Sequence, residues 1–433
     1  MANGYRSAGP QWPHVVILDP FTAGLAAARR MVRLGAHVTM LVDPCDMFVD
    51  RTRGVHSIVS PFGDDGAEWF ELLQRIAAAG DEIVVLPTTD RSCELLLEKA
   101  ELLSPNVRMF ERASSAHRAL MDKEQANTIA RAAGVRVPWS AIVNSPEEID
   151  AAVLEAPWPC VVKPILSHDW RARYGDERVF LVADADEARE RLRVPLQDGT
   201  EMLLSQYIPG GDDDVEEAIV VRLADGSYPV LFGCHKLRQD PPGFGATTVG
   251  EASQLRDTTA LARRVLDEAS FVGVAGVETK RHALTGERWF LEVNVRMPGQ
   301  WGLGDTCGVA ATQRLVDALC DRPLGPQPKM HEGVRFLLPH LDAHVVGPAL
   351  RQTRPLGRPA AALRFASAYV GVRDFGLLNV RDPGPGLAWI SVIAQRRLSA
   401  LRGHIGARRA PADEPRTPPA PAPVPAPAPA PRR

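Results

Sequence analysis

The chain has 433 residues, of which 45% are hydrophobic, and its formal net charge is −3. This length allows two or three domains with a substantial core, and the near-neutral charge gives no electrostatic reason to expect a nucleic-acid partner. The six cysteines are scattered and the apolar runs are strand-sized, which argues against a zinc site, a disulfide framework and a membrane span. Because the N-terminal residues do not resemble a signal peptide, we expect a cytoplasmic protein with buried thiols.

Residues 1–112 alternate between strand and helix patterns. Apolar runs at 14–19 and 82–87 predict buried strands, and the helical stretch after the first run ends near Gly35, a typical C-cap. We therefore expect a doubly wound, Rossmann-like parallel sheet. The turn DPFTAGLA has one glycine where a dinucleotide fingerprint needs three, so a nicotinamide oxidoreductase is a minor alternative.

The pattern changes near Ser114, and residues 113–330 predict an α+β domain. Its clearest element is a hairpin, because two apolar runs flank the Asp-Gly pair at 225–226. Residues 331–409 are expected to form a C-terminal subdomain that caps the substrate side. From 410 to 433 the chain is almost entirely proline and alanine, which predicts a disordered tail.

Polar residues interrupt the apolar strand FLEVNVRM in a regular way. Residues i and i+2 of a strand point to the same side, so Glu292, Asn294 and Arg296 share one face. Two of these side chains are oxygen donors of the kind that Mg²⁺ prefers, and the third is a fork for phosphate or carboxylate. Glu278, on the preceding strand, is expected to reach the same metal ions. The alternative is a solvated sheet face with an Arg–Glu pair.

Two lysines stand in positions that suit a phosphate. Lys163 follows the apolar run CVV and precedes a proline, and Lys123 begins the helical stretch KEQANTIARAAG. A point charge at such a position favours phosphate binding. The alternatives are a snorkelling lysine at a strand end for Lys163 and a surface helix residue for Lys123.

These motifs occur in one order with regular gaps: Lys123, Lys163, LLSQYIPGG, Glu278 in GVAGVE, and EVNVR. Together they resemble the ATP-grasp superfamily over residues 113–330, and the first 112 residues look like its pre-ATP-grasp domain. The resemblance is greatest to carboxylate–amine ligases, the D-aspartate ligase-like or carbamoyl phosphate synthetase-like branch. It implies a two-lobed ATP-grasp domain that uses ATP and Mg²⁺, with Mn²⁺ as a substitute.

The resemblance also implies roles for individual residues. The ATP phosphates would be held by Lys123 and Lys163, and the ribose by Asp213 or Asp214, with Glu217 as the fallback. Metal ions would be bound by Glu278, Glu292 and Asn294, and the transferred phosphoryl group by Arg296. The adenine would lie against one strand end, made of Ser205, Gln206, Tyr207 and Ile208.

Two segments depart from the usual pattern of that superfamily. Ser205 and Gln206 stand where an acidic residue is common, so nucleotide preference is less defined. The loop after Lys163, often glycine-rich, is LSHDWRARYGDERV here, and its basic side chains are expected to cover the phosphates. An ordinary polar loop is the alternative.

The segment HKLRQDPPGFGATTVGE follows a strand and carries two basic residues and two nearby glycines. We interpret it as the substrate-side loop, with Lys236 and Arg238 in catalytic positions and Arg238 near the substrate carboxylate. A long surface hairpin loop is the alternative.

We therefore expect an ATP-dependent ligase that activates a carboxylate as an acyl phosphate and joins it to an amine. The alternatives are an ATP-grasp enzyme with a thiol or bicarbonate as its other substrate, and a nucleotide-binding module without turnover. The expected partners are small-molecule carboxylates and amines, with no nucleic acid or membrane partner and a homodimer as one possible assembly.

Overall fold

The computed structural model describes residues 12–79, 82–112, 116–165, 170, 173–174 and 179–394. Contacts divide the chain into one compact unit that extends to Gly386 and a second unit from Leu387 onward. In the described ranges no helix has both the length and the apolar character that crossing a membrane requires. The proline- and alanine-rich segment 410–433 and most of the loop 166–178, including His168 and Arg171, lie outside the described residues.

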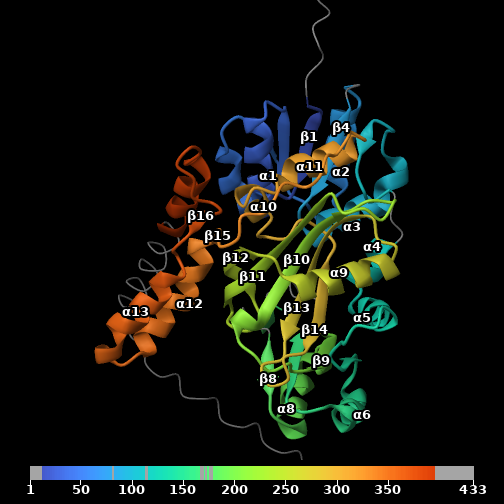
Figure 1. Cartoon of the computed structure of the whole chain (residues 1–433). Coiled ribbons are helices and arrows are strands. Elements are labelled where there is room, and N and C mark those ends of the chain that lie inside the picture. Colours follow the sequence, from blue (N-terminus) through green and yellow to red (C-terminus); the bar gives the residue numbers. More distant parts are fainter. Residues whose placement is uncertain are drawn as a thin grey trace, which may run out of the picture. The chain divides into compact units, whose positions relative to one another are not determined.

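The N-terminal region is a five-stranded parallel sheet with the strand order β3-β2-β1-β4-β5 (Figure 1). Its strands are β1 (His14–Leu18), β2 (Val38–Val42), β3 (His56–Val59), β4 (Ile83–Pro87) and β5 (Val107–Arg108). Helices α1 (Thr22–Arg33), α2 (Ala67–Ala77) and α3 (Asp90–Lys99) connect them. Strands β2 and β4 are buried along their whole length, as expected when helices pack on a parallel sheet. The predicted parallel sheet is confirmed.

A four-stranded antiparallel sheet follows, with the order β6-β9-β7-β8. Its strands are β6 (Ser140–Val143), β7 (Cys160–Pro164), β8 (Phe180–Val182) and β9 (Met202–Gln206). Helices α6 (Ile149–Glu155) and α8 (Ala185–Gln197) pack against it and share its apolar core. Two helices, α4 (Ala116–Met121) and α5 (Lys123–Ala132), lead into this sheet but contribute to the core of the next one.

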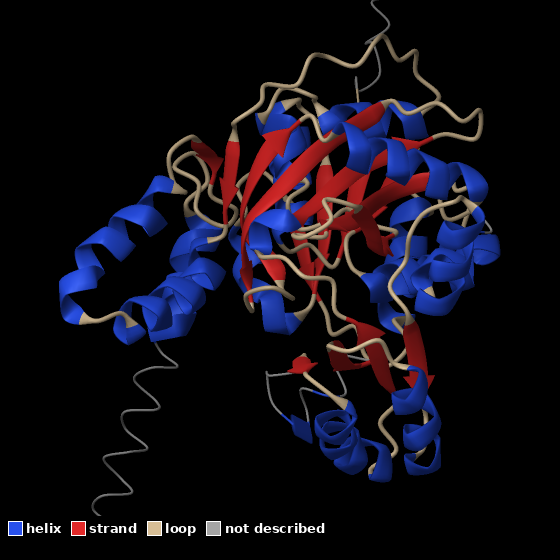
Figure 2. Cartoon of the chain, turned by 60° about the horizontal axis from the view of Figure 1, so that its bottom comes forward, coloured by secondary structure: helices blue, strands red, loops and turns tan. Residues whose placement is uncertain are grey.

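The largest sheet has seven strands in the order β14-β13-β10-β11-β12-β15-β16, and Figure 2 shows its strong twist. The five long strands are β10 (Val215–Arg222), β11 (Val230–Asp240), β12 (Ala246–Ser253), β13 (Gly273–Arg281) and β14 (Arg288–Asn294). Helix α9 (Arg256–Glu268) covers one face with α5, through the buried side chains of Leu261, Val265 and Phe290. The opposite face is free to carry polar groups.

The C-terminal part of the compact unit contributes two short edge strands, β15 (Arg335–Leu337) and β16 (Val372–Asp374). Between and before them lie α10 (Gly302–Thr306), α11 (Ala311–Leu319), α12 (Pro339–Gln352) and α13 (Arg358–Ser367). The 3-10 helices are η1 (Pro44–Arg51), η2 (Ala100–Leu102), η3 (Pro146–Glu148), η4 (Asp212–Asp214) and η5 (Pro355–Gly357). Two short strands from the stretch expected as a C-terminal subdomain thus join the edge of the large sheet.

The segment interpreted as a substrate-side loop is mostly strand. Strands β11 and β12 pair from Gly233 to Asp240, with a bulge beside Arg238, and only residues 241–245 form the connecting turn. Lys236 and Arg238 therefore project from a rigid strand. Charged residues are unusual in a buried strand, so the sequence did not predict a strand here. Both charges are compensated by acidic side chains from distant elements, Glu278 and Asp342.

Candidate functional site

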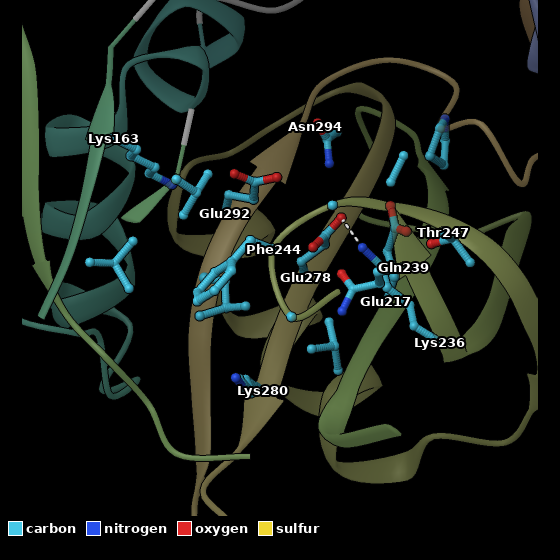
Figure 3. A pocket seen from close by; sticks show the side chains of 18 of the residues that line it. Lys163, Glu217, Lys236, Gln239, Phe244, Thr247, Glu278, Lys280, Glu292 and Asn294 are labelled. Carbon is cyan, nitrogen blue, oxygen red and sulfur yellow. Dashed lines mark hydrogen bonds and ion pairs between the residues drawn. The ribbon is translucent and has the colours of Figure 1, made fainter. Parts of the chain in front are cut away.

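A cavity of about 470 Å³ lies where the four-stranded sheet faces the polar side of the large sheet. Segments from α5, β7, β9, β10, β11, β13 and β14 line it, together with the start of α1 (Figure 3). Eleven of the residues singled out from the sequence lie on its wall: Lys123, Lys163, Ser205, Gln206, Tyr207, Ile208, Lys236, Glu278, Glu292, Asn294 and Arg296. Side chains up to 173 positions apart in the chain are thus gathered in one place.

The acidic and amide side chains come from two neighbouring strands. Antiparallel pairing places Glu278 of β13 directly opposite Glu292 of β14, and Gly276 opposite Asn294. Directly opposed residues of a sheet project from the same face, so both carboxylates enter the cavity together. Asn294 follows Glu292 by two residues and keeps the same side. The period of two that the sequence showed is therefore the feature that builds this wall.

Two lysines, one of them on the four-stranded sheet, compensate the charge of Glu292. Burial would raise the pKa of its carboxyl group, but the Lys163 ammonium, and after it that of Lys123, holds the pKa below its usual value. Figure 3 shows Lys163 reaching toward Glu292 across the cavity. Glu292 is therefore ionised at neutral pH. Lys123 is the first residue of α5 after the N-cap Asp122, and it also lines the cavity.

Lys236 forms the tightest ion pair in the cavity. Its Nζ lies 2.6 Å from Glu278 Oε1, and the side chains are 3% and 15% exposed. Burial alone would lower the pKa of Lys236, but Glu278 and then Glu217 raise it. Burial raises the pKa of Glu278, and the Lys236 ammonium opposes this rise. The pair keeps two charges inside a region that would otherwise exclude them.

Arg296 connects the cavity to the N-terminal sheet. It lies just beyond the end of β14, and its Nε is 2.7 Å from Asp90 Oδ1 at the start of α3. A second guanidinium nitrogen is 3.4 Å from Asn294 Oδ1. Burial lowers the pKa of Arg296, but the Asp90 carboxylate raises it overall. The guanidinium is thus held in place while it still lines the cavity.

The other end of the cavity is formed by the strand end at 205–208 with aromatic neighbours. The rings of Tyr207 and Phe244 lie 6.1 Å apart, and Lys280 Nζ is 4.8 Å from the centre of the Tyr207 ring. Lys280 and Phe244 were not predicted from the sequence, and both line the cavity. A flat ligand with a hydrogen-bonding edge fits this combination of backbone edge, rings and ammonium.

The structure places three predicted site residues elsewhere. Arg238 is not on the cavity wall, because its guanidinium is bound by Asp342 at 2.6 Å and lies over the ring of Phe365. Asp213 is exposed, and its backbone carbonyl accepts a hydrogen bond from His235. Asp214 pairs with Arg281 at 2.6 Å. The turn that carries Asp213 and Asp214 thus contacts the neighbouring strands β11 and β13. Neither carboxylate lines the cavity.

Glu217 and Gln300 line the cavity although only Glu217 was considered from the sequence, and then as a fallback ribose ligand. Burial first, and then the Glu278 charge, raises the pKa of Glu217 to about 8. The position of Glu217 within the run VEEAIVV could have indicated a functional residue, because an unpaired carboxyl group is costly in a buried strand. Gln300 lies in a loop and gave no such signal.

Three oxygen-donor side chains on the cavity wall are candidate ligands of Mg²⁺. No group of three His, Cys, Asp or Glu side chains in the described ranges is arranged to enclose a metal ion. Two carboxylates and one amide oxygen nonetheless share the same wall, from Glu278, Glu292 and Asn294. Mg²⁺ usually takes one or two carboxylates and completes its octahedron with waters and phosphate oxygens. The donor set fits an ion that arrives with a phosphate ligand.

Comparison with known sequences gives a partial match. No family model matches the chain. The N5-carboxyaminoimidazole ribonucleotide synthases of Mycobacterium tuberculosis and Mycobacterium bovis are 29% identical to it over 209 residues. The match covers 45% of this chain and 44% of each relative, so the chain spans less than half the length of the curated relatives it matches.

Solved structures match a larger share of the chain. An ADP complex of N5-carboxyaminoimidazole ribonucleotide synthetase has a TM-score of 0.59 and 18% identity, covering 78% of this chain and 84% of its own. Biotin carboxylase from Campylobacter jejuni has a TM-score of 0.55 at 13% identity, with coverages of 75% and 74%. L-amino acid ligase from Bacillus licheniformis reaches 0.54 at 16% identity, with coverages of 73% and 78%. The chain has the ATP-grasp fold, as the sequence motifs indicated.

Proposed function

We propose that this protein is an ATP-dependent ligase that activates a carboxylate as an acyl phosphate and joins it to an amine. The observation that carries the proposal is the convergence of Lys123, Lys163 and Arg296 with Glu278 and Glu292 around one cavity. Cations placed this way suit a triphosphate, and the carboxylates suit its metal ions. Structures with the same fold include ADP complexes of N5-carboxyaminoimidazole synthetases and an L-amino acid ligase.

The nucleotide is proposed to lie with its base at the Tyr207 end of the cavity. The end of β9 exposes backbone groups to a purine edge, and Lys280 and Phe244 close the other sides. Lys163 and Lys123 then face the phosphates. Glu278, Glu292 and Asn294 hold Mg²⁺, which when bound would spread the negative charge of the triphosphate.

The reaction follows from the leaving groups. A carboxylate oxygen attacks the γ-phosphorus and ADP departs, which gives an acyl phosphate. The amine nitrogen then attacks the acyl carbon, phosphate leaves with the C–O bond electrons, and the nitrogen loses a proton. Arg296, held by Asp90, faces the developing negative charge. Fixed donors of this kind act most strongly where water is excluded.

A second candidate is carboxylation of an amine, with bicarbonate as the activated acid. The sequence relatives favour it, since they are named as synthases of a carboxylated amine. The same cavity suits both reactions, because bicarbonate is the smallest carboxylic acid. A binding module without turnover is the third possibility, and the full set of charged groups on the cavity wall is evidence against it.

The test is ADP release by the purified chain with ATP, Mg²⁺ and a panel of amino acids, other carboxylates and bicarbonate. The ligase predicts release that requires both a carboxylate and an amine. Release that depends on bicarbonate and an amine supports the second candidate. ATP binding without release for any pair contradicts both and supports the module. Glu292→Gln is the control for activity of a contaminating ATPase.

A further inference from the structure

One corner of the cavity is built differently from the charged wall described above. Glu217 of β10 is fully buried, and its Oε2 accepts a hydrogen bond from Gln300 Nε2. Its Oε1 is also buried and has no hydrogen-bond partner among the described residues. An unpaired buried acceptor destabilises the folded protein, and more so when it is charged. A ligand that donates a hydrogen bond there would remove this cost.

The local backbone leaves room for the Glu217 carboxyl group. On the neighbouring strand β13, a side chain at Gly276 would collide with Glu217 Oε1 and lie close to Pro298. Pro298, Gly299 and Gln300 form the adjoining stretch of cavity wall. Because Gln300 uses its Nε2 to donate to Glu217, its carbonyl oxygen is left as a second acceptor. The corner therefore brings together two oxygens that can accept a hydrogen bond, Glu217 Oε1 and the Gln300 side-chain carbonyl.

Apolar side chains adjoin this corner. A Cβ at Gly299 would be 3.4 Å from Thr22 Oγ1, which places Gln300 next to the turn that carries Phe21. Leu338 approaches the same turn, since its Cδ2 and the Thr22 Cγ2 both lie against Gly376. Phe21, Leu338 and Leu341 line the cavity, and Phe21 is fixed by edge contacts with two neighbouring rings. The corner that holds Glu217 and Gln300 thus adjoins an apolar part of the cavity wall.

The charged side chains elsewhere in the cavity indicate which part of the substrates each region binds. Lys123, Lys163 and Arg296 form the cationic part, which suits the phosphates and the activated carboxylate. Lys236, a cation that acts on Glu217, is already paired with Glu278 at 2.6 Å, so it is not available to a carboxylate ligand at this corner. A group with N–H donors and no negative charge suits this corner, and its apolar surroundings suit a hydrocarbon substituent.

We infer that Glu217 and Gln300 bind the amino group of the acceptor substrate, and that Phe21, Leu338 and Leu341 select an acceptor whose remaining part is apolar. This inference rests on the proposed ligase function. The acceptor class is an amine or amino acid with an aliphatic or aromatic side chain. Glu217 acts here as a binding residue, and the step in which the carboxylate is activated does not require it.

The experiment separates the two halves of the reaction. Hydroxylamine traps an acyl phosphate as a hydroxamate and so reports carboxylate activation without the acceptor amine. Amide formation with leucine, phenylalanine, glycine, serine, aspartate and lysine then reports acceptor use. The wild-type protein should favour leucine or phenylalanine over serine and aspartate by at least tenfold in kcat/KM.

In Glu217→Gln, amide formation should fall at least tenfold more than hydroxamate formation, mainly through a higher KM for the amine. Glu216→Gln is the matched control. It makes the same change one residue earlier on β10, where the carboxylate pairs with Arg288 at 2.8 Å on the other face of the strand. This control should leave the ratio of the two rates unchanged.

Leu341→Asn tests the apolar wall separately, and it should reduce the preference for leucine over serine at least fivefold. Equal loss of hydroxamate and amide formation in Glu217→Gln would overturn the inference while the ligase assignment stands. A wild-type preference for aspartate or serine would do the same. Failure of the wild-type protein to form hydroxamate with any carboxylate would overturn the ligase assignment, and the inference with it.

Discussion

Asp342→Ala tests whether the C-terminal helices are anchored to the large sheet by one buried charge cluster. Asp342 of α12 is 1% exposed and accepts two contacts from Arg238 Nη1, at 2.6 and 2.8 Å. It also accepts hydrogen bonds from Thr248 at 2.8 Å and from Tyr369 at 2.5 Å. One carboxylate therefore joins β11, β12 and the segment after α13.

The expected loss of stability in Asp342→Ala comes from the buried Arg238 guanidinium, which is left without its carboxylate partner. Removing one partner of a buried ion pair typically costs about 3–5 kcal/mol, because the other charge stays buried and unpaired. The buried Thr248 hydroxyl also loses its acceptor, but this cost overlaps with the first. We expect a loss of about 4 kcal/mol in the free energy of unfolding, close to a thousandfold in the unfolding equilibrium constant.

Urea denaturation followed by tryptophan fluorescence and circular dichroism measures this cost. The double variant Arg238→Met with Asp342→Leu should recover most of the stability, since apolar replacement of a buried pair is often neutral. Glu287→Ala is the matched control, because its pair with Arg136 is exposed and should contribute at most about 1 kcal/mol. The double variant should also retain ADP release, as Arg238 does not line the cavity.

Two results would refute this reasoning. A loss of less than about 1 kcal/mol in Asp342→Ala would show that the cluster does not hold α12 in place. Loss of ADP release in a folded Arg238→Met protein would return Arg238 to the substrate site, where the sequence alone had placed it.

Lys163→Ala or Glu292→Gln should slow ADP release at least about a hundredfold, since one such electrostatic group typically contributes about 3 kcal/mol to lowering the barrier; near-normal phosphate release from a folded variant contradicts the assignment. Chelation by EDTA should stop ADP release and added Mg²⁺ should restore it, so release that persists in EDTA counts against the metal ligands. Burial raises the pKa of Glu111 from 4.5 to about 7, so the folded state keeps a proton that the unfolded chain loses. The contribution of Glu111 to the free energy of unfolding should therefore fall by roughly 3 kcal/mol as the pH rises from 4.5 to 7, then level off, and Glu111→Gln should remove this part of the decline in urea titrations. Matching pH profiles for that variant and the wild type would contradict the burial argument.

The sequence predicted the features that depend on short-range order. The parallel sheet followed from apolar runs of five or six residues separated by helices, and its β1 and β4 lie where expected. The acidic wall followed from alternation, because a strand places Glu292 and Asn294 on one side whatever the rest of the chain does. Strands β15 and β16, with three residues each, were missed because so few positions show no period.

The placement of charges was decided by the tertiary structure. Arg238 looked like a substrate ligand because its partner Asp342 is 104 positions away on a helix that had no clear sequence pattern. From the sequence, Glu217 was only a fallback ligand for the ribose, because the residues that surround it, Gly276 and Gln300, come from other segments. Local pattern determines which side of an element a residue faces. Which charge it meets there depends on contacts between distant segments, and the sequence carries no local signal for those.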